Sequence, residues 1–208
     1  MTTDQLKAVA GCTAANAQIF SPYISDTLTK YNINTPARIL CFLAQVSHES
    51  GGLFYTEELA SGQAYEGRKD LGNVNPGDGV KYKGRGLIQI TGRTNYQALS
   101  AALGADFINN PTLLGGKNMR LCSPDQLKYA ALSAGWFWNR TNLNAIADKI
   151  NIQQPVDEGN NLDNFKLMTR RINGGYNGLA DRLHRYKLGV SSFVQTVTPA
   201  PTTTAVPQ

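Results

Sequence analysis

The chain has 208 residues, of which 20 are Lys or Arg and 15 are Asp or Glu, so its formal net charge is +5. This length suits one sizeable core, and the basic residues are spread along the chain instead of forming a patch that reads bases. The distribution favours a polyanionic surface as partner and disfavours nucleic acid. We expect one catalytic unit with two lobes over residues 1–192 and a disordered Pro- and Thr-rich tail over residues 193–208.

The cysteines and the N-terminal residues indicate in which cellular compartment the protein is made. Cys12, Cys41 and Cys122 are odd in number and widely spaced, which favours free thiols over a disulfide framework or a zinc motif. The N-terminus lacks a charged region followed by an apolar run, and no 18 apolar residues occur together. We therefore expect a monomer made in the cytosol, without stable membrane insertion.

Residues 3–31 predict two short helices, around Asp4–Val9 and Pro22–Tyr31. The next helix has the clearest signals, because Thr35 is a good N-cap and Pro36 suits the first helical position. Residues 39–46 leave almost no polar face, which indicates a helix enclosed in the core. A glycine pair at positions 51 and 52 then ends this helix.

Glu49 falls in the last turn of this helix. The negative end of the helix dipole and the apolar residues before it both oppose ionisation of a carboxyl group. We expect Glu49 to retain its proton unusually well, as a general acid does. A solvated glutamate at a helix end is the alternative that the local sequence leaves open. Glu57 and Glu58 follow shortly after, so a pair of catalytic carboxylates is possible.

Residues 60–83 predict a long, irregular, glycine-rich loop that walls a groove. Apolar and polar residues alternate near the end of residues 87–91, which predicts a strand of a small β-hairpin. In such a strand Gln89 and Thr91 point to one side, which either lines a site or forms the polar outer face of an edge hairpin. The nearby glycines do not form GxGxxG, so nucleotide binding is not expected.

The remaining chain predicts further helices, so the fold class is mainly α. Ser123 and Gln126 form a capping box at the start of a helix that runs to about Asn139. The aromatic residues 136–138 near its end belong either to the core or to a platform for stacking sugars, and the core is the better interpretation. The other expected helices cover Asn95–Leu103, Asn142–Ile150, Leu162–Ile172 and Leu179–Val190.

The chemistry that these residues allow is narrow. His48 and His184 are the two histidines, and Glu49 is not part of HExxH, so we expect no metal and no cofactor. A serine hydrolase is equally unsupported, since the chain has no GxSxG. Glycoside hydrolysis fits better, because it needs one carboxylic acid for the leaving oxygen and a second carboxylate that attacks or activates water. Glu49 and Glu58 can supply both.

Three blocks also carry a family resemblance: AQVSHESGG followed by Glu58, then YKGRGLIQITGRTNY, then RRINGGYNGLADR. Their order and amino-acid sequences resemble those of the glycoside hydrolase family 19 chitinases and their phage endolysin relatives over most of residues 36–190. The resemblance implies an α-helical, lysozyme-like fold with a cleft between two lobes and an inverting mechanism.

The same resemblance implies roles for single residues. It makes Glu49 the general acid and selects Glu58 as the general base, with Glu57 as the adjacent rival. It makes Thr91 the hydroxyl residue that helps hold the attacking water. It places the substrate-binding residues at His48, Gln89, Asn95, Tyr96, Asn173 and Arg182.

Arg182 matches an arginine that tunes the acidic cluster of the family. One departure is visible, because plant members often place a glutamate shortly after INGG, where this chain has Asn177. The charges around Arg182 are therefore expected to differ from those of the plant proteins.

Family 19 members cut β-1,4 chains that contain N-acetylglucosamine, and both chitin and peptidoglycan qualify. The basic charge, the lack of an export signal and the lack of a cysteine-rich chitin-binding module favour peptidoglycan and a phage endolysin. We expect such a protein to act on a Gram-negative host, staying in the cytoplasm until the membrane is permeabilised. The alternatives are a chitinase, a lytic transglycosylase that uses one glutamate and no water, and a non-catalytic wall-binding protein.

Overall fold

The structure is a computed structural model in which residues 1–194 are described, and it is mainly α-helical, as predicted. The predicted tail begins two residues too early, because residues 193 and 194 still belong to the last helix, and residues 195–208 lie outside the described part. Within that part, no helix is long and apolar enough to cross a membrane. The α-helices are α1 (Thr3–Ala10), α2 (Ala14–Lys30), α3 (Pro36–Glu49), α4 (Asp78–Lys81), α5 (Arg93–Leu103), α6 (Pro124–Arg140), α7 (Leu143–Ala147), α8 (Gly159–Asn173) and α9 (Leu179–Val194).

Helix α2 is longer than the sequence predicts, because it begins at Ala14 and not at Pro22. The side chain of Thr13 caps it by accepting a hydrogen bond of 3.2 Å from the backbone N–H of Asn16. Pro22 lies inside this helix and removes one backbone hydrogen bond. The helix continues because the side chains of Phe20 and Ile24 are fully buried, and tertiary packing supplies most of the stability of helices in proteins.

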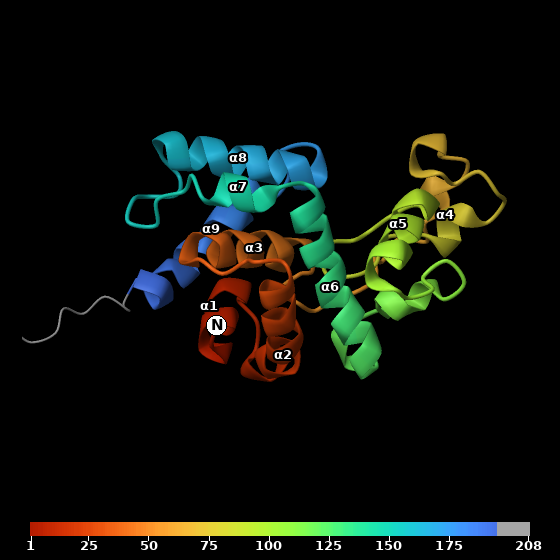
Figure 1. Ribbon diagram of the computed structural model, residues 1–208, viewed down its shortest axis with the longest axis horizontal. Helices are drawn as coiled ribbons and strands as arrows, with labels where there is room; N and C mark the ends of the chain where they lie inside the picture. Colours follow the sequence, from red (N-terminus) through yellow and green to blue (C-terminus); the bar gives the residue numbers. More distant parts are fainter. Residues whose placement is uncertain (195–208) are drawn as a thin grey trace, which may run out of the picture.

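Helix α3 lies in the core, as predicted. Thr35 caps it by accepting a hydrogen bond from the N–H of Arg38, and residues 40–47 are all buried. The helix packs against α1, α7 and α9 (Figure 1). Gly51 and Gly52 adopt φ values of 59° and 73°, which turns the chain away immediately after Glu49.

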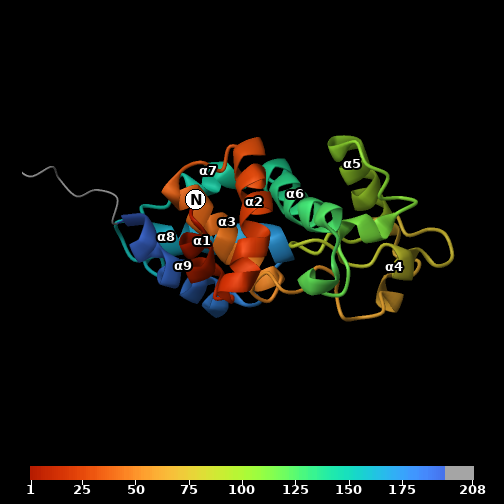
Figure 2. The same cartoon turned by 90° about the horizontal axis from the view of Figure 1, so that it is seen from below.

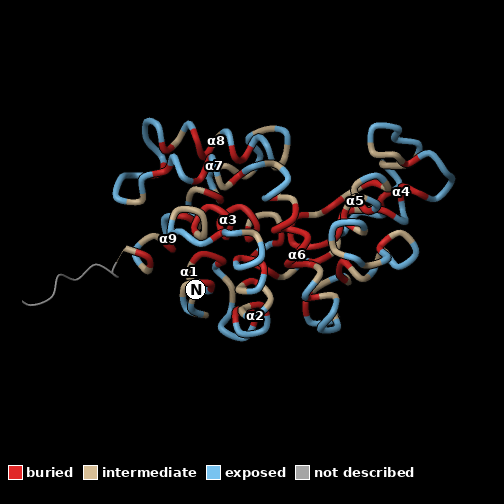
Figure 3. Tube along the Cα trace, viewed as in Figure 1, coloured by how far each residue is buried: buried red, intermediate tan, exposed pale blue. Residues whose placement is uncertain are grey.

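Helix α6 separates two groups of elements, as both Figure 1 and Figure 2 show. Helices α1–α3 and α7–α9 lie on one side of it, and α4 and α5 lie on the other. Helix α6 contacts α2, α7 and α5, and the predicted capping box of Ser123 and Gln126 begins it. Figure 3 shows buried stretches along α3 and α6. The predicted irregular loop over residues 60–83 contains α4 and two short 3-10 turns, Gln63–Tyr65 and Lys69–Leu71; further turns cover Pro111–Leu114 and Met119–Leu121.

The expected β-hairpin is reduced to two isolated antiparallel bridges, which join Arg85 to Glu57 and to Ile90. The prediction of a strand over residues 87–91 is therefore wrong. The backbone N–H groups here bond elsewhere: that of Gly86 donates to the carbonyl oxygen of Thr56, and that of Leu87 donates to a carbonyl oxygen of α6. A tight turn follows and not an extended strand.

The aromatic residues at the end of α6 belong mainly to the core. Trp138 is fully buried, its ring lies edge-on to that of Phe42, and Trp136 is 9% exposed. The interpretation as core is confirmed for these two rings, so they offer little surface for a sugar. Helix α7 is shorter than predicted, while α8 begins earlier and α9 extends further.

Candidate active site

Glu49 is held by a buried arginine. Arg182 is 1% exposed; its Nη2 atom donates a hydrogen bond to Oε1 of Glu49, and its Nη1 donates to Oε1 of Gln45 at 2.6 Å. The amide of Gln45 donates in turn to the hydroxyl of Thr169 at 3.0 Å, and Nε of Arg182 donates to the carbonyl oxygen of Asn177. Each of the three guanidinium nitrogens of Arg182 has a defined acceptor, so the orientation of this group beside Glu49 is fixed.

Arg182 places a positive charge beside Glu49, in addition to the negative end of the α3 dipole. A neighbouring cation favours the charged form of a carboxyl group, while the helix end opposes it. The retained proton of Glu49 therefore stays a prediction. The side chain of Glu49 is 19% exposed, so it is accessible to a substrate.

His48 and Asn173 lie near the hydrogen bonds of Arg182 but are not themselves bonded to its guanidinium or to Glu49. Nδ1 of His48 is 2.7 Å from Oδ2 of Asp181, and the imidazole ring packs directly on Gly178. The side-chain amide of Asn173 donates to the carbonyl oxygen of Asn177, the atom that also accepts from Arg182. Both predicted substrate-binding residues thus help to shape the start of α9, the helix that carries Arg182, and the turn before it.

Glu58 lies in a different environment. Its Oε2 atom accepts a hydrogen bond of 2.9 Å from the hydroxyl of Tyr65, while its Oε1 atom is buried and has no partner among the described residues. Its backbone N–H donates to the carbonyl oxygen of Gly84. A buried carboxylate oxygen without a donor is costly, and such exceptions in folded proteins are often functional.

Gln89 and Thr91 do lie with Glu58, although not as neighbours on a strand. A Cβ atom placed on Gly84 would be 2.9 Å from Oε1 of Gln89, 3.1 Å from Oε2 of Glu58 and 3.3 Å from Oγ1 of Thr91. The three polar side chains therefore converge over Gly84. The turn achieves this because Gln89 adopts a positive φ of 58°, and Asn95 bonds to the backbone oxygen of Thr91 from the start of α5.

Glu57 is occupied by two cations. Its Oε1 atom is 2.9 Å from Nζ of Lys83, and its Oε2 atom accepts a hydrogen bond of 2.8 Å from Nε of Arg85. Burial opposes ionisation, but the hydrogen bond from Lys83 and the charge of Arg85 outweigh it and lower the pKa of Glu57. Both oxygens of Glu57 already bind a donor, which leaves Glu58 as the better candidate for a base.

Tyr96 has no surface that a sugar could contact, which differs from the expectation. The side chain is fully buried, and its hydroxyl donates to the carbonyl oxygen of Lys83 at 2.6 Å and accepts from Nη1 of Arg85 at 3.1 Å. Burial raises the pKa of Tyr96. Tyr96 therefore positions the guanidinium of Arg85 by accepting its hydrogen bond. Arg182 is likewise buried and positions Glu49, so neither residue is placed to bind substrate directly.

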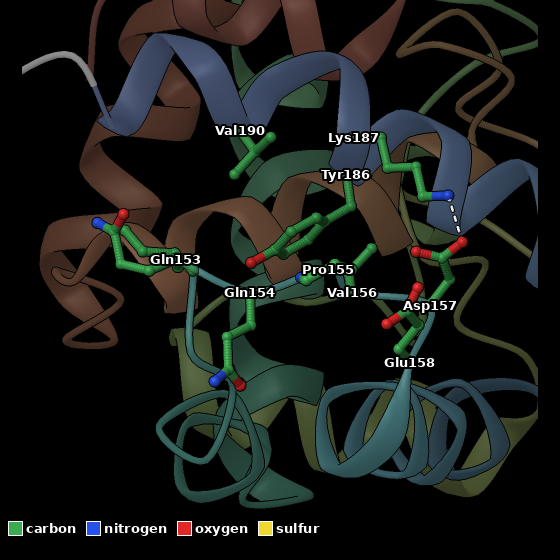
Figure 4. Close-up of a pocket in the computed structure, with 10 residues that line it drawn as sticks. Gln153, Gln154, Pro155, Val156, Asp157, Glu158, Tyr186, Lys187 and Val190 are labelled. Carbon is green, nitrogen blue, oxygen red and sulfur yellow. Dashed lines mark hydrogen bonds and ion pairs between the residues drawn. The ribbon is translucent and has the colours of Figure 1, made fainter.

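A pocket of about 200 Å³ adjoins this site and is lined by Glu57, Glu58, Leu59, Lys83 and Lys117. A larger cavity of about 560 Å³ lies elsewhere, between the α7–α8 connector and α9 (Figure 4). Two of its three charged residues, Asp157 and Lys187, form an ion pair at 2.5 Å, and none of the predicted site residues lines it. Residues 1–194 contain no group of three His, Cys, Asp or Glu side chains that could hold a metal ion.

Gln45 and Tyr65 were not among the predicted site residues. Gln45 precedes Glu49 by four positions, so the two side chains share one face of α3, and a lone glutamine in an apolar run is the signal that identifies it. Tyr65 lies in the irregular loop, where no periodic pattern indicates which side chain returns to the site.

The helical architecture is that of a lysozyme-like glycosidase, and comparisons with known proteins identify the family. A family model described as chitinase class I matches residues 14–182. A family 19 domain-containing protein of Haemophilus influenzae is 30% identical over 177 residues, covering 70% of this chain and 75% of that protein. An endochitinase of Arabidopsis thaliana, At2g43620, is 35% identical over 161 residues, covering 77% of this chain and 45% of its own length.

Solved structures agree on the fold. Chitinase C from Streptomyces griseus matches with a TM-score of 0.59 at 24% identity, covering 94% of this chain and 92% of that one. The chain belongs to glycoside hydrolase family 19 and is therefore a glycosidase. It spans about half the length of the plant endochitinases that it matches.

Proposed function

We propose that this glycosidase hydrolyses β-1,4 bonds of bacterial peptidoglycan by an inverting mechanism with two carboxyl groups, and that it serves as a phage endolysin. Glu49 is the general acid and Glu58 is the general base. In this role the enzyme stays in the host cytoplasm until the membrane is permeabilised and then reaches the wall.

The observation that carries the reaction is the contrast between the two carboxylates. Glu49 contacts a buried cation through one oxygen, while Oε1 of Glu58 is buried and has no donor within residues 1–194. Such different environments divide two titratable groups into an acid and a base, and the match of Glu49 to the general acid of the family assigns the two roles.

The acid half of the reaction follows from Arg182. Because Arg182 bonds to Oε1 of Glu49, the proton for the leaving sugar oxygen is placed on Oε2. As the bond breaks, positive charge develops on the sugar, and the carboxylate that remains is stabilised by the guanidinium.

The base half follows from the side chains over Gly84. Glu58 accepts a proton from the attacking water, while Thr91 and Gln89 lie close enough to Gly84 to orient that water beside the carboxylate. The hydroxyl of Tyr65 donates to Oε2 of Glu58, the oxygen that lies over Gly84, and so holds the carboxylate in place.

The choice of polymer rests on charge. Peptidoglycan is anionic, and the net charge of +5 attracts it, whereas chitin is neutral. Chitin is the second candidate, because the relatives from Arabidopsis thaliana and Nicotiana tabacum are endochitinases by name.

The test is the clearing of outer-membrane-permeabilised cells by the wild type and by Glu49→Gln and Glu58→Gln. Each substitution keeps the size of the side chain and removes its proton chemistry, so each should abolish clearing while the circular dichroism spectrum stays unchanged. Glu158→Gln is the matched control, because Glu158 is exposed and lies on the α7–α8 connector. Full activity of Glu49→Gln would refute the assignment.

Mass spectrometry of the released fragments separates the remaining alternatives. Reducing ends without an anhydro group support hydrolysis, and 1,6-anhydro ends indicate a lytic transglycosylase. The reducing-end sugar shows which of the two β-1,4 bonds is cut. Cleavage of chitin oligomers without cleavage of peptidoglycan would favour the chitinase, and clearing that survives loss of both glutamates would indicate a wall-binding protein.

A further inference from the structure

The segment Gly115–Leu121 is fixed directly against the residues that lead to Glu58. The hydroxyl of Thr56 donates a hydrogen bond of 2.6 Å to the carbonyl oxygen of Gly116, and the backbone N–H of Met119 donates to the carbonyl oxygen of Phe54 at 2.8 Å. A Cβ atom on Gly115 would be 2.4 Å from the carbonyl oxygen of Thr56, so the two backbones are in close contact. The position of Lys117, directly after Gly116, is therefore determined by main-chain contacts.

Lys117 contributes an unpaired positive charge to the pocket beside Glu58. It lines the 200 Å³ pocket with Glu57, Glu58, Leu59 and Lys83, and its side chain is exposed. No hydrogen bond or ion pair within residues 1–194 engages its ammonium group. This lysine is free to bind a ligand.

The other cation that lines the pocket, Lys83, is already paired. Lys83 pairs with Glu57 and donates to the carbonyl oxygens of Glu58 and Ala60, both at 3.3 Å. Arg85 binds the second oxygen of Glu57. Of the two cations that line the pocket, Lys83 is therefore paired with Glu57, and Lys117 pairs with no carboxylate of the described residues. Lys117 is therefore the lining cation that is available to an anionic group in the pocket.

We propose that Lys117 forms a subsite for a carboxylate on the substrate, next to the general base. The inference rests on the proposed function, and it names the feature that selects a glycan with charged substituents over a neutral one. The free carboxylates of the peptide stems of peptidoglycan are such groups, and chitin has none.

The experiment removes the charge from each side of this contact in turn. The kcat and KM of the wild type and of Lys117→Gln are measured on native peptidoglycan, on peptidoglycan whose stem carboxylates have been amidated, and on a neutral hexamer of N-acetylglucosamine. Lys149→Gln is the matched control, because Lys149 is an exposed lysine at the end of α7 and its loss changes the net charge by the same amount.

On native peptidoglycan, Lys117→Gln should lower kcat/KM about fivefold through a higher KM, which is the upper end for an accessible ion pair. Amidation of the substrate should lower kcat/KM of the wild type by the same factor and leave Lys117→Gln unaffected, because the pair can be lost only once. The hexamer should not distinguish the enzymes, and Lys149→Gln should behave as the wild type.

Two results would overturn the subsite while leaving the proposed function intact. One is equal activity of the wild type and Lys117→Gln on native peptidoglycan. The other is an equal loss by Lys117→Gln on native and amidated substrates, which would mean a structural effect. A wild type that cleaves the hexamer but not peptidoglycan would instead refute both the endolysin and the subsite.

Discussion

Gln45 and Glu49 lie one turn apart on the same face of α3, and the guanidinium of Arg182 bonds to both. The amide of Gln45 thereby connects the arginine to Thr169 on α8. The position of the proposed acid thus depends on a neutral side chain that the substrate does not contact.

Replacing Gln45 by Leu should lower kcat about tenfold with little change in KM, because Arg182 loses an acceptor and no longer fixes Glu49. The pH profile of kcat should shift, since the surroundings of the acid change. Leaving a buried charged donor unpaired should also cost about 2 kcal/mol of stability. Ser47→Ala is the control on the same helix, because the buried hydroxyl of Ser47 has no partner within the described residues. An unchanged pH profile in Gln45→Leu would argue against this positioning role.

Gly84→Ala should reduce activity strongly while the protein stays folded. The new methyl group would lie within 2.9 to 3.3 Å of Gln89, Glu58 and Thr91, so these side chains must move by a few tenths of an ångström. Small misplacements of catalytic groups cost up to about a hundredfold in rate. Steady-state kinetics on peptidoglycan measure the loss, and Gly175→Ala, which would meet nothing within 4 Å, should change little.

Stability at acidic pH should depend on Glu57. Because its pKa is lowered on folding, its contribution to stability is present above the ordinary value of 4.5 and is lost as pH falls through the lower value in the folded state. Glu57→Gln should therefore cost about 2 kcal/mol at pH 7, where Lys83 and Arg85 lose their partner, and much less at pH 3. Urea unfolding of both proteins at the two pH values tests this. An equal difference at pH 7 and pH 3 would contradict it.

Two buried tyrosines should respond oppositely to loss of the hydroxyl group. The hydroxyl of Tyr186 is buried without a partner in the described structure, so Tyr186→Phe should be neutral or stabilise by about 1 kcal/mol. The hydroxyl of Tyr96 has two partners, so Tyr96→Phe should destabilise by about 1–3 kcal/mol. Thermal unfolding of the pair measures the difference. A similar loss in both variants would show that Tyr186 has an unrecognised partner.

The helices could be predicted because their signals are local. Thr35 with Pro36 and Ser123 with Gln126 begin α3 and α6 through hydrogen bonds within one turn, so a short stretch of sequence contains all the information. Helix α2 was predicted too short because Pro22 is unfavourable inside a helix, and only the packing of distant residues compensates for it.

The site could be predicted only in part. The place of Glu49 followed from the end of α3, but its pairing with Arg182 joins positions 133 residues apart, and the family resemblance alone pointed to it. The choice between Glu57 and Glu58 depends on which carboxylate Lys83 and Arg85 occupy, and spacing along the chain contains no such information. Likewise the turn at Gln89 results from backbone bonds to Thr56 and α6.

The oxygen of residue 177 that accepts from both Arg182 and Asn173 belongs to the main chain. Any amino acid except one that distorts the turn would offer the same acceptor. A substitution at this position that keeps the turn therefore leaves the acceptor of Arg182 in place. The charge at position 177 can thus be changed while Arg182 keeps its hold on the proposed acid.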